Sequence, residues 1–437
     1  MKKNKKILKI FASTIALCAL FLFLPHICRA TYWYNGDWQY RQKIDVLADK
    51  VGADLTNFPT YLNLSLLGTN FWQNVGVGCG DIRITKDDGL TELPREIVGC
   101  EIASTTGELW FKADELQNTI TTSFYVYYGN SETGDYESGD TYGKFNVWTG
   151  FNKVYHLQNN SHDSTNNGND GTDLNISYPY SKILHGAHAT NSGNSEIDFN
   201  DGTEISGTDQ FSLSFWIYVP SYSTSYVAPF SRRDIYPSDW SLVFQGLDTS
   251  KKVYFGLPGN DIFLDDNYVY TMGWSHYVIN RSGNFFKMYV DGVEVGADTN
   301  SATIGVGHRL QMFRANDNSL GLEAGWKLDE VRFSDNAHSN KWIETEFNNQ
   351  FDNNAFFEIN LYEEVPPDVP YVPNDQISFS LTHNNIITCI TDQPCELIIN
   401  ATTDENGWLV NLAEAGICNL DQSFLATTTI INGQGVL

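Results

Sequence analysis

The sequence predicts an all-β protein: tandem antiparallel β-sandwiches followed by a short C-terminal β segment. Short runs of alternating apolar and polar residues, bounded by Gly, Asn and Asp turns, recur about every ten residues. Aromatic residues make up 14% of the chain, and no long stretch shows the apolar repeat of an amphipathic helix. With 437 residues, the chain is long enough for two or three domains.

Residues 1–30 have the pattern of a secretory signal peptide. Five lysines precede an uncharged, mostly apolar run at 10–24, and Ala30 supplies a small residue for cleavage. A retained N-terminal anchor is the alternative, although a run of 15 residues is short for a membrane span. We therefore expect a secreted or cell-surface protein with no membrane span in the mature chain.

The mature chain is strongly acidic. Its formal net charge is −26 with residues 1–30 and becomes −32 when the six cations of that segment are removed. Such a surface repels phosphate backbones, so we expect no nucleic acid partner. The same charge is compatible with a bound divalent cation.

The first domain is expected at residues 31–145. Its predicted strands lie at 43–46, 61–66, 81–85, 93–98, 108–112 and 123–128. Three motifs mark the domain: Trp38-x-Tyr40-Arg41, the run 80–85 followed by Asp88-Gly89 and Leu93-Pro94, and Tyr127-Tyr128-Gly129-Asn130. In combination they resemble a family of prokaryotic surface proteins, the domain of unknown function family 2341. The resemblance implies location and architecture but no reaction.

Cys79 and Cys100 are expected to form a disulfide, because a secreted chain folds in an oxidising compartment. A hairpin register with Thr85 opposite Pro94 places the two cysteines opposite each other. Such a bond would stabilise the fold by ~3 kcal/mol through loop entropy. The alternative is a pair of separate buried thiols.

The second domain is expected at 151–362. Predicted strands lie at 195–199, 211–219, 286–290 and 293–296, and Asp291-Gly292 is a hairpin turn. The alternation at 328–334 predicts a closing strand with one buried face. Ser339 is expected to cap a short helix that carries Ile343 and Phe347 on one side.

Six motifs in order resemble the laminin-G-like, concanavalin A-type domains of surface proteins. They are Tyr155-His156-Leu157, the turn at 163–171, the strand at 211–217, Trp274-x-His276, the hairpin at 288–292 and the strand at 328–332. The resemblance implies a jelly-roll sandwich, and family members often carry structural calcium near its rim. It also implies a binding function rather than catalysis.

A Pro-rich linker is expected at 363–376, followed by a small or incomplete β domain at 377–437. Cys389 and Cys395 are expected to close a small loop there, which leaves Cys418 without a partner.

The turn at 163–170 gathers carboxylate and amide oxygens, the ligands that calcium prefers. The candidate calcium ligands are Asp163, Asn169, Asp170 and Asp329. The alternative is an Asn- and Gly-rich turn whose side chains cap their own backbone.

Aromatic rings and polar side chains in two loops have the chemistry of a sugar site. The candidate ligand-binding residues are Arg233, Asp234, Tyr236, Trp240, Arg314 and Asn316. Exposed packing of the loop aromatics is the alternative. The expected ligand is an extracellular glycan or a surface protein.

The concanavalin A-like fold also hosts glycoside hydrolases, and Glu196-Ile197-Asp198 resembles the start of their acidic strand motif. Asn200 occupies the position of the next acidic residue, so we expect no enzyme activity. The favoured function is therefore adhesion or binding outside the cell. A glycoside hydrolase and a non-binding structural spacer of a larger envelope protein are the alternatives.

Overall fold

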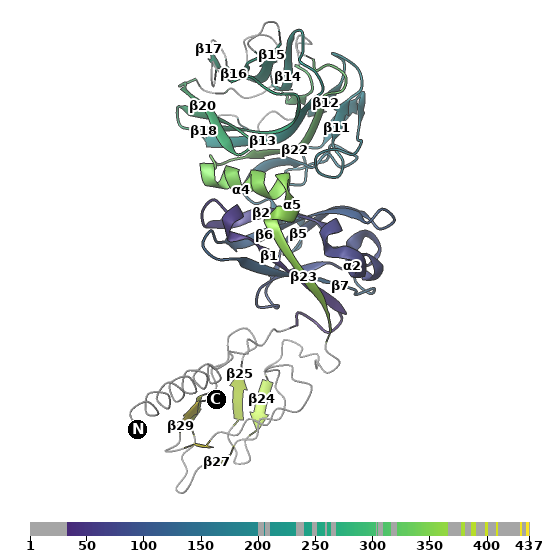
Figure 1. Cartoon of the computed structure of the whole chain (residues 1–437), viewed down its shortest axis with the longest axis vertical. Coiled ribbons are helices and arrows are strands. Elements are labelled where there is room, and N and C mark those ends of the chain that lie inside the picture. The colour runs from purple at the N-terminus through teal and green to yellow at the C-terminus, as the bar shows by residue number, and fades with distance from the viewer. Residues whose placement is uncertain are drawn as a thin grey trace, which may run out of the picture. The chain divides into compact units, whose positions relative to one another are not determined.

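The computed structural model describes residues 33–365, except for 200–204, 206–209, 233–239, 247–250, 258–259, 264–267, 303, 305–308 and 316–320. It also describes six short strands beyond residue 376. Residues Tyr34–Val365 form one compact unit that contains both predicted sandwiches (Figure 1). The later strands belong to a second unit. The all-β prediction is confirmed.

The first sandwich has a five-stranded sheet, in the order β23-β1-β7-β3-β4, that faces a three-stranded sheet, β2-β6-β5. Its strands within the first 130 residues are β1 Tyr40–Val46, β2 Leu55–Asn63, β3 Arg83–Lys86, β4 Glu92–Leu93, β5 Arg95–Glu101, β6 Thr106–Leu116 and β7 Thr122–Tyr128. Four short helices complete it: η1 Ala48–Lys50, η2 Leu64–Leu67, α2 Gly68–Asn74 and η3 Val77–Cys79. Side chains such as Ile44, Phe111 and Phe124 fill its core.

The predicted Cys79–Cys100 disulfide is present, but the register used to predict it is wrong. Thr85 lies opposite Glu92 rather than Pro94. Cys79 ends η3, whereas Cys100 lies on β5 in the other sheet, so the bond is not a cross-strand bridge within one hairpin. The chain turns between sheets at Pro94, and the sequence did not show this change of sheet.

The second sandwich is larger. Among the described residues, one sheet has eight strands in the order β10-β11-β22-β13-β18-β19-β20, with β8 also paired to β22. The other has seven strands, β17-β16-β15-β14-β21-β12-β9. The strands are β8 Phe151–Tyr155, β9 Gly171–Leu174, β10 Ile176–Ser177, β11 Ala187–Ala189, β12 Glu196–Phe199, β13 Gln210–Val219, β14 Tyr226–Ser231, β15 Ser241–Gln245, β16 Val253–Leu257, β17 Asn260–Phe263, β18 Gly273–Ser282, β19 Phe285–Val290, β20 Val293–Thr299, β21 Gln311–Met312 and β22 Lys327–Ser334. The short helix α3, Lys144–Val147, precedes β8.

The predicted hairpin between β19 and β20 is confirmed. Val290 pairs with Val293, and Asp291 and Gly292 both have positive φ. That backbone is the one that two-residue turns of the Asn-Gly or Asp-Gly type adopt.

Strand β22 and the helix that follows it differ partly from expectation. Ser339 caps α4, Asn340–Phe351, by accepting a hydrogen bond from the Trp342 amide, as predicted. However, β22 is buried on both faces rather than one. Helix α4 and the first sandwich cover the face that would otherwise meet solvent (Figure 1). A strand covered twice can bury charged residues only where they find partners.

The chain then returns to the first sandwich. After the short helix α5, Asn353–Phe356, strand β23, Phe357–Glu364, pairs with β1 along the edge of the five-stranded sheet. The segment 357–362, expected in the second domain, therefore lies in the first. Phe356 and Phe357 fill the first core, which explains why this segment docks there.

The second unit holds three antiparallel strand pairs. They join β24 Ile377–Ser380 with β25 Ile386–Cys389, β26 Ile398–Asn400 with β29 Gln434–Val436, and β27 Trp408–Leu409 with β28 Thr429–Ile430. The predicted loop between Cys389 and Cys395 lies outside the described residues, as does Cys418. In the part of the chain that the structure describes, no helix has the length and apolar character needed to cross a membrane.

Candidate functional site

The outer face of the seven-stranded sheet carries a row of polar and small residues. Asp198 of β12 lies opposite Gln311 of β21, and Gln311 lies opposite Ser231 of β14. Ser231 in turn lies opposite Ser241 of β15. Their strand neighbours Ile197, Met312, Phe230 and Leu242 all belong to the core. Because side chains alternate along a strand, the row points away from the core.

One end of this row is charged. Asp198 pairs with Arg309, while Glu196 Oε2 accepts from Arg314 Nη1 at 3.3 Å and from Gln311 Nε2 at 3.4 Å. We call these five residues the β12–β21 site. The side chains of Glu196, Asp198 and Arg314 are 19%, 17% and 14% exposed. They therefore reach solvent, whereas Gln311 forms a buried floor.

Three buried polar atoms of the β12–β21 site lack a hydrogen-bond partner within the described residues: Asp198 Oδ1, Gln311 Oε1 and Arg314 Nε. Leaving such atoms unpaired costs about 1–3 kcal/mol each. Burial raises the pKa of Asp198, although Arg309 opposes the rise. Two of these atoms are acceptors and one is a donor, and all three are buried, although the side chains of Asp198 and Arg314 are partly exposed.

Two tyrosines lie on the same outer face. Tyr226 lies opposite Gln245, and Tyr254 lies opposite Val243, in positions that flank the inward-facing Phe244. The two tyrosine rings are 6.4 Å apart and half-buried. Aromatic faces next to polar groups are the usual surface for a sugar ring.

The structure separates the predicted ligand-binding residues. Arg314 belongs to the β12–β21 site. Trp240 does not face a ligand: it is fully buried in the second core and stacks on Phe255 at 5.3 Å. Trp240 directly precedes β15, and its side chain packs in the core rather than in a surface loop. Arg233, Asp234, Tyr236 and Asn316 lie outside the described residues.

The proposed calcium loop is closed by its own hydrogen bonds. Asp163 accepts from the backbone amides of Val154, Thr165 and Asn169, and Asp170 accepts from the Asp163 amide. These contacts are those of a self-capping turn.

Asp329 is fully buried on β22, where its Oδ2 accepts from the Ile183 amide at 2.9 Å. Among the described residues, Asp163, Asp170 and Asp329 do not gather into one ligand group. The calcium site stays a prediction.

The acidic pattern on β12 alternates as expected, because Ile197 and Phe199 are buried while Glu196 and Asp198 face outward. Both carboxylates are engaged by arginines. Asn200 lies outside the described residues.

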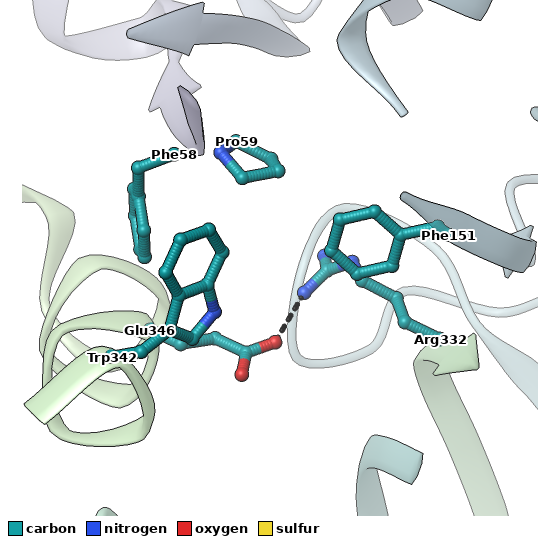
Figure 2. A pocket seen from close by; sticks show the side chains of 6 residues that line it. All are labelled: Phe58, Pro59, Phe151, Arg332, Trp342 and Glu346. Carbon is teal, nitrogen blue, oxygen red and sulfur yellow. Dashed lines mark hydrogen bonds and ion pairs between the residues drawn. The ribbon is translucent and has the colours of Figure 1, made fainter. Parts of the chain in front are cut away.

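A pocket opens between the two sandwiches (Figure 2). Its lining residues are Phe58, Pro59, Phe151, Arg332, Trp342 and Glu346. The empty volume is about 180 Å³ and includes open solvent, which is small against the ~300–1,000 Å³ of ligand pockets. Arg332 Nη1 donates to Glu346 Oε1 at 2.9 Å across it.

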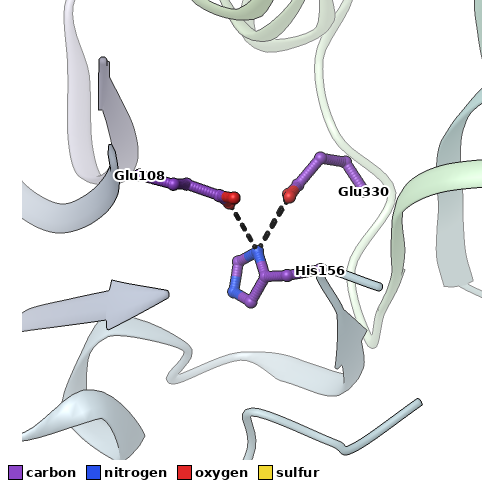
Figure 3. Close-up of side chains that lie close together, drawn as sticks. All are labelled: Glu108, His156 and Glu330. Atoms are coloured by element: carbon purple, nitrogen blue, oxygen red, sulfur yellow. Dashed lines mark hydrogen bonds and ion pairs between the residues drawn. The ribbon is translucent and has the colours of Figure 1, made fainter. Parts of the chain in front are cut away.

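Behind this pocket lies a buried cluster that the sequence analysis did not find: Glu108, His156 and Glu330 (Figure 3). A bulge in β22 gives Glu330 a positive φ, and such bulges redirect side chains. Burial and the Glu330 carboxylate raise the pKa of Glu108 to about 8. Burial opposes the charge on His156, but Glu330 and Glu96 outweigh it and raise its pKa well above the usual value.

No local signal marks this cluster. His156 and Glu330 are 174 positions apart, and each sits in a segment with an ordinary strand pattern. A run of two acidic residues within an apolar strand, Asp329-Glu330, is the only hint that the strand meets a buried polar partner.

Two family models match the chain. Residues 78–166 match "Domain of unknown function (DUF2341)", and residues 191–344 match "Concanavalin A-like lectin/glucanases superfamily". The chain therefore has a concanavalin A-like domain preceded by a DUF2341 domain, as the motifs predicted. No curated protein matches the sequence.

Solved structures also resemble parts of the chain. Domain 4 of AbnA, an extracellular arabinanase from Geobacillus stearothermophilus solved with arabinotriose, is 22% identical over 45% of this chain and 97% of that one, with a TM-score of 0.38. The botulinum neurotoxin type G receptor binding domain is 14% identical over 46% of this chain and 51% of its own, with a TM-score of 0.35. A Trypanosoma rangeli sialidase is 10% identical over 54% of this chain and 42% of its own, with a TM-score of 0.36.

Proposed function

Because a concanavalin A-like domain follows a DUF2341 domain in this chain, we propose that the protein is a secreted or cell-surface binding protein that recognises a glycan at the β12–β21 site. The observation that carries the proposal is the set of unpartnered atoms on Asp198, Gln311 and Arg314. The basic and apolar character of residues 1–30 supports export.

The charges favour an uncharged glycan. Within the β12–β21 site, two carboxylates are matched by two arginines, so the site itself carries no net charge. The chain as a whole is strongly acidic and repels sialylated or sulfated sugars at long range. Paired carboxylates and guanidinium groups can bind neighbouring hydroxyls of a neutral sugar ring.

A glycan array tests the proposal with residues 31–437 and two matched variants. Gln311→Leu removes the amide floor of the site at similar volume. Gln42→Leu makes the same change at a buried glutamine on β1, far along the chain, and serves as control. We expect the wild type and Gln42→Leu to bind uncharged glycans, with Gln311→Leu weaker by about 10-fold, the loss of roughly one hydrogen bond.

If the wild type binds no glycan on the array, the proposal is overturned. A protein partner or the structural-spacer alternative would then be favoured. Equal binding by Gln311→Leu and the wild type would show that Gln311 of β21 is not part of the glycan site. Binding only to acidic glycans would contradict the charge argument.

Binding without hydrolysis is part of the proposal. Glu196 and Asp198 are both held by arginines, which leaves neither poised as an acid and neither as a nucleophile. We expect no new reducing ends when bound glycans are incubated with the protein. Release of reducing ends that Glu196→Gln abolishes would instead support a glycoside hydrolase.

Calcium is a separate proposal, at Asp163, Asn169 and Asp170. An ion that binds only the folded state stabilises that state by RT ln(1 + [L]/Kd), and so raises the melting temperature. Adding calcium to chelator-treated protein should therefore raise it. An unchanged melting temperature would contradict the calcium proposal and would mean that the loop is only a self-capping turn.

A further inference from the structure

The side chains of Glu108, His156 and Glu330 converge on one point between the two sandwiches (Figure 3). His156 Nδ1 lies 2.9 Å from Glu330 Oε1 and 3.3 Å from Glu108 Oε1. One ligand atom from each residue lies within 4.8 Å of the other two. Glu108 comes from β6 of the first sandwich, whereas Glu330 comes from β22 of the second.

We propose that these three residues bind a divalent transition-metal ion, zinc or manganese. One imidazole nitrogen and two carboxylate oxygens form a mixed set that such ions accept. Calcium and magnesium prefer oxygen ligands alone and suit the set less well. The proposal is independent of glycan binding at the β12–β21 site.

Two of the three spacings between ligand atoms are close to those around such an ion. Tetrahedral zinc with bonds of about 2.0–2.2 Å separates its ligand atoms by about 3.3–3.6 Å. The distances from His156 Nδ1 to the two carboxylates differ from this by a few tenths of an ångström at most.

One oxygen of the Glu108 carboxylate, Oε2, accepts no hydrogen bond from a described residue, whereas Oε1 accepts from Trp110 Nε1. Glu108 is fully buried, its carboxylate is aimed into the cluster, and its Oε2 has no hydrogen-bond partner among the described residues (Figure 3). A carboxylate oxygen without a partner is costly to bury. A metal ion bound by both oxygens of Glu108 would satisfy it.

Glu96 holds the orientation of His156 by contacting the ring nitrogen that is not a proposed metal ligand. Its Oε2 lies 3.2 Å from His156 Nε2, the nitrogen that faces away from Glu108 and Glu330. Glu96 is itself fixed by hydrogen bonds from Trp148 Nε1 and Ser164 Oγ. A carboxylate that receives the second N–H of a metal-bound histidine is the common supporting arrangement of metal sites.

Arg332 also contacts the cluster. Arg332 donates to Glu330 Oε2, which leaves Oε1 for the ion.

The pocket in Figure 2 shares one residue with the surroundings of the cluster. Arg332 lines this pocket and also donates to Glu330.

The test is a calorimetric titration of chelator-stripped residues 31–437 with zinc chloride and manganese chloride. We expect one equivalent to bind with release of protons, which repeats in buffers of different ionisation enthalpy would count. Glu108→Gln has the shape of a protonated glutamate and should fold. It should weaken binding by more than about 100-fold, the larger loss seen for outer partners of metal sites.

Glu101→Gln is the matched control, because Glu101 lies 3.9 Å from His185 in a partly exposed histidine–glutamate pair. This variant should bind metal as the wild type does. Three results would overturn the proposal: no metal uptake by the wild type, equal affinity in Glu108→Gln, or tighter binding of calcium than of zinc and manganese. The first would mean that protons alone hold the cluster together.

Discussion

The His276 side chain of β18 lies fully buried beneath helix α4. Its ring packs on Trp216 at 5.1 Å and on Phe347 at 6.2 Å, and neither ring nitrogen has a hydrogen-bond partner among the described residues. Burial lowers the pKa of His276 to about 4, well below its ordinary value. The folded protein therefore holds this histidine neutral in mildly acidic solution.

This burial predicts a pH dependence. His276 takes up a proton near pH ~6.5 in the unfolded chain but only near pH 4 in the folded chain. The free energy of unfolding therefore has its full contribution from His276 above pH ~6.5 and loses it as the pH falls toward 4. The loss between these values is about 3 kcal/mol. His276→Phe keeps an aromatic ring and cannot titrate, so urea unfolding from pH 7 to 4.5 should show a shallower decline. Parallel declines in both proteins would show that His276 does not titrate as described.

The burial of single residues could be predicted from the sequence where the local alternation of apolar and polar residues determines it. Ile197 and Phe199 alternate with acidic neighbours, and the structure buries them as expected. The prediction that Trp240 binds a ligand was wrong, because the sequence of an aromatic residue beside a polar loop is the same whether its side chain faces solvent or the core. The Cys79–Cys100 bond was predicted correctly from an incorrect register.

At the scale of elements, helix α4 joins the two sandwiches through side-chain amides. The Tyr61 amide donates to Asn349 Oδ1 at 2.7 Å, and Asn349 Nδ2 donates to the Tyr61 carbonyl at 2.9 Å. Asn349 thus pairs with β2 much as a neighbouring strand would. On the second sandwich, Trp216 Nε1 donates to Gln350 Oε1 at 2.7 Å.

Asn349→Ala should therefore destabilise the protein by about 1–3 kcal/mol, because it leaves buried backbone groups of Tyr61 with fewer partners. Asn354→Ala, at an exposed position of the next helix, is the control and should have little effect. Urea unfolding measures both. Equal stability of the two variants would mean that Asn349 does not hold the helix to β2.

The start of α4 was predictable because a capping serine is a local signal, and Ser339 accepts from the Trp342 amide as expected. The destination of β23 was not. Register between segments about 300 positions apart depends on which sheet edge remains open, and the local pattern of 357–364 does not show which of the two cores will bury Phe357.

On the scale of the whole molecule, β23 ties the two sandwiches into one unit. The chain passes through the second sandwich and then completes the sheet of the first. Arg41 of β1 donates to Glu363 of β23 at 2.6 Å, and the buried Glu108–His156–Glu330 cluster also spans both.

We therefore expect β6 and β18 to unfold together. Hydrogen exchange at rising denaturant should show both strands losing protection at the same concentration, because neither sandwich keeps its full set of contacts alone. Protection of β18 that outlasts that of β6 would instead indicate two independent domains. The comparison uses strands central to each sandwich.

The sequence motifs were sufficient to find both sandwiches, because alternation and turns are local. The β12–β21 site and the buried cluster depend on contacts between distant strands, such as Asp198 with Gln311 and His156 with Glu330. Only Arg314 of the β12–β21 site was named in advance as a ligand-binding residue, from its loop composition.

The most direct test of glycan recognition is the NMR signal of the Arg314 Nε–H group, assigned by its loss in Arg314→Lys. This donor has no partner in the described part of the chain. The β12–β21 proposal predicts that a saturating neutral glycan shifts the signal and slows its exchange with water, since a sugar oxygen accepts the hydrogen. A glycan that binds and leaves this signal unchanged would contradict it.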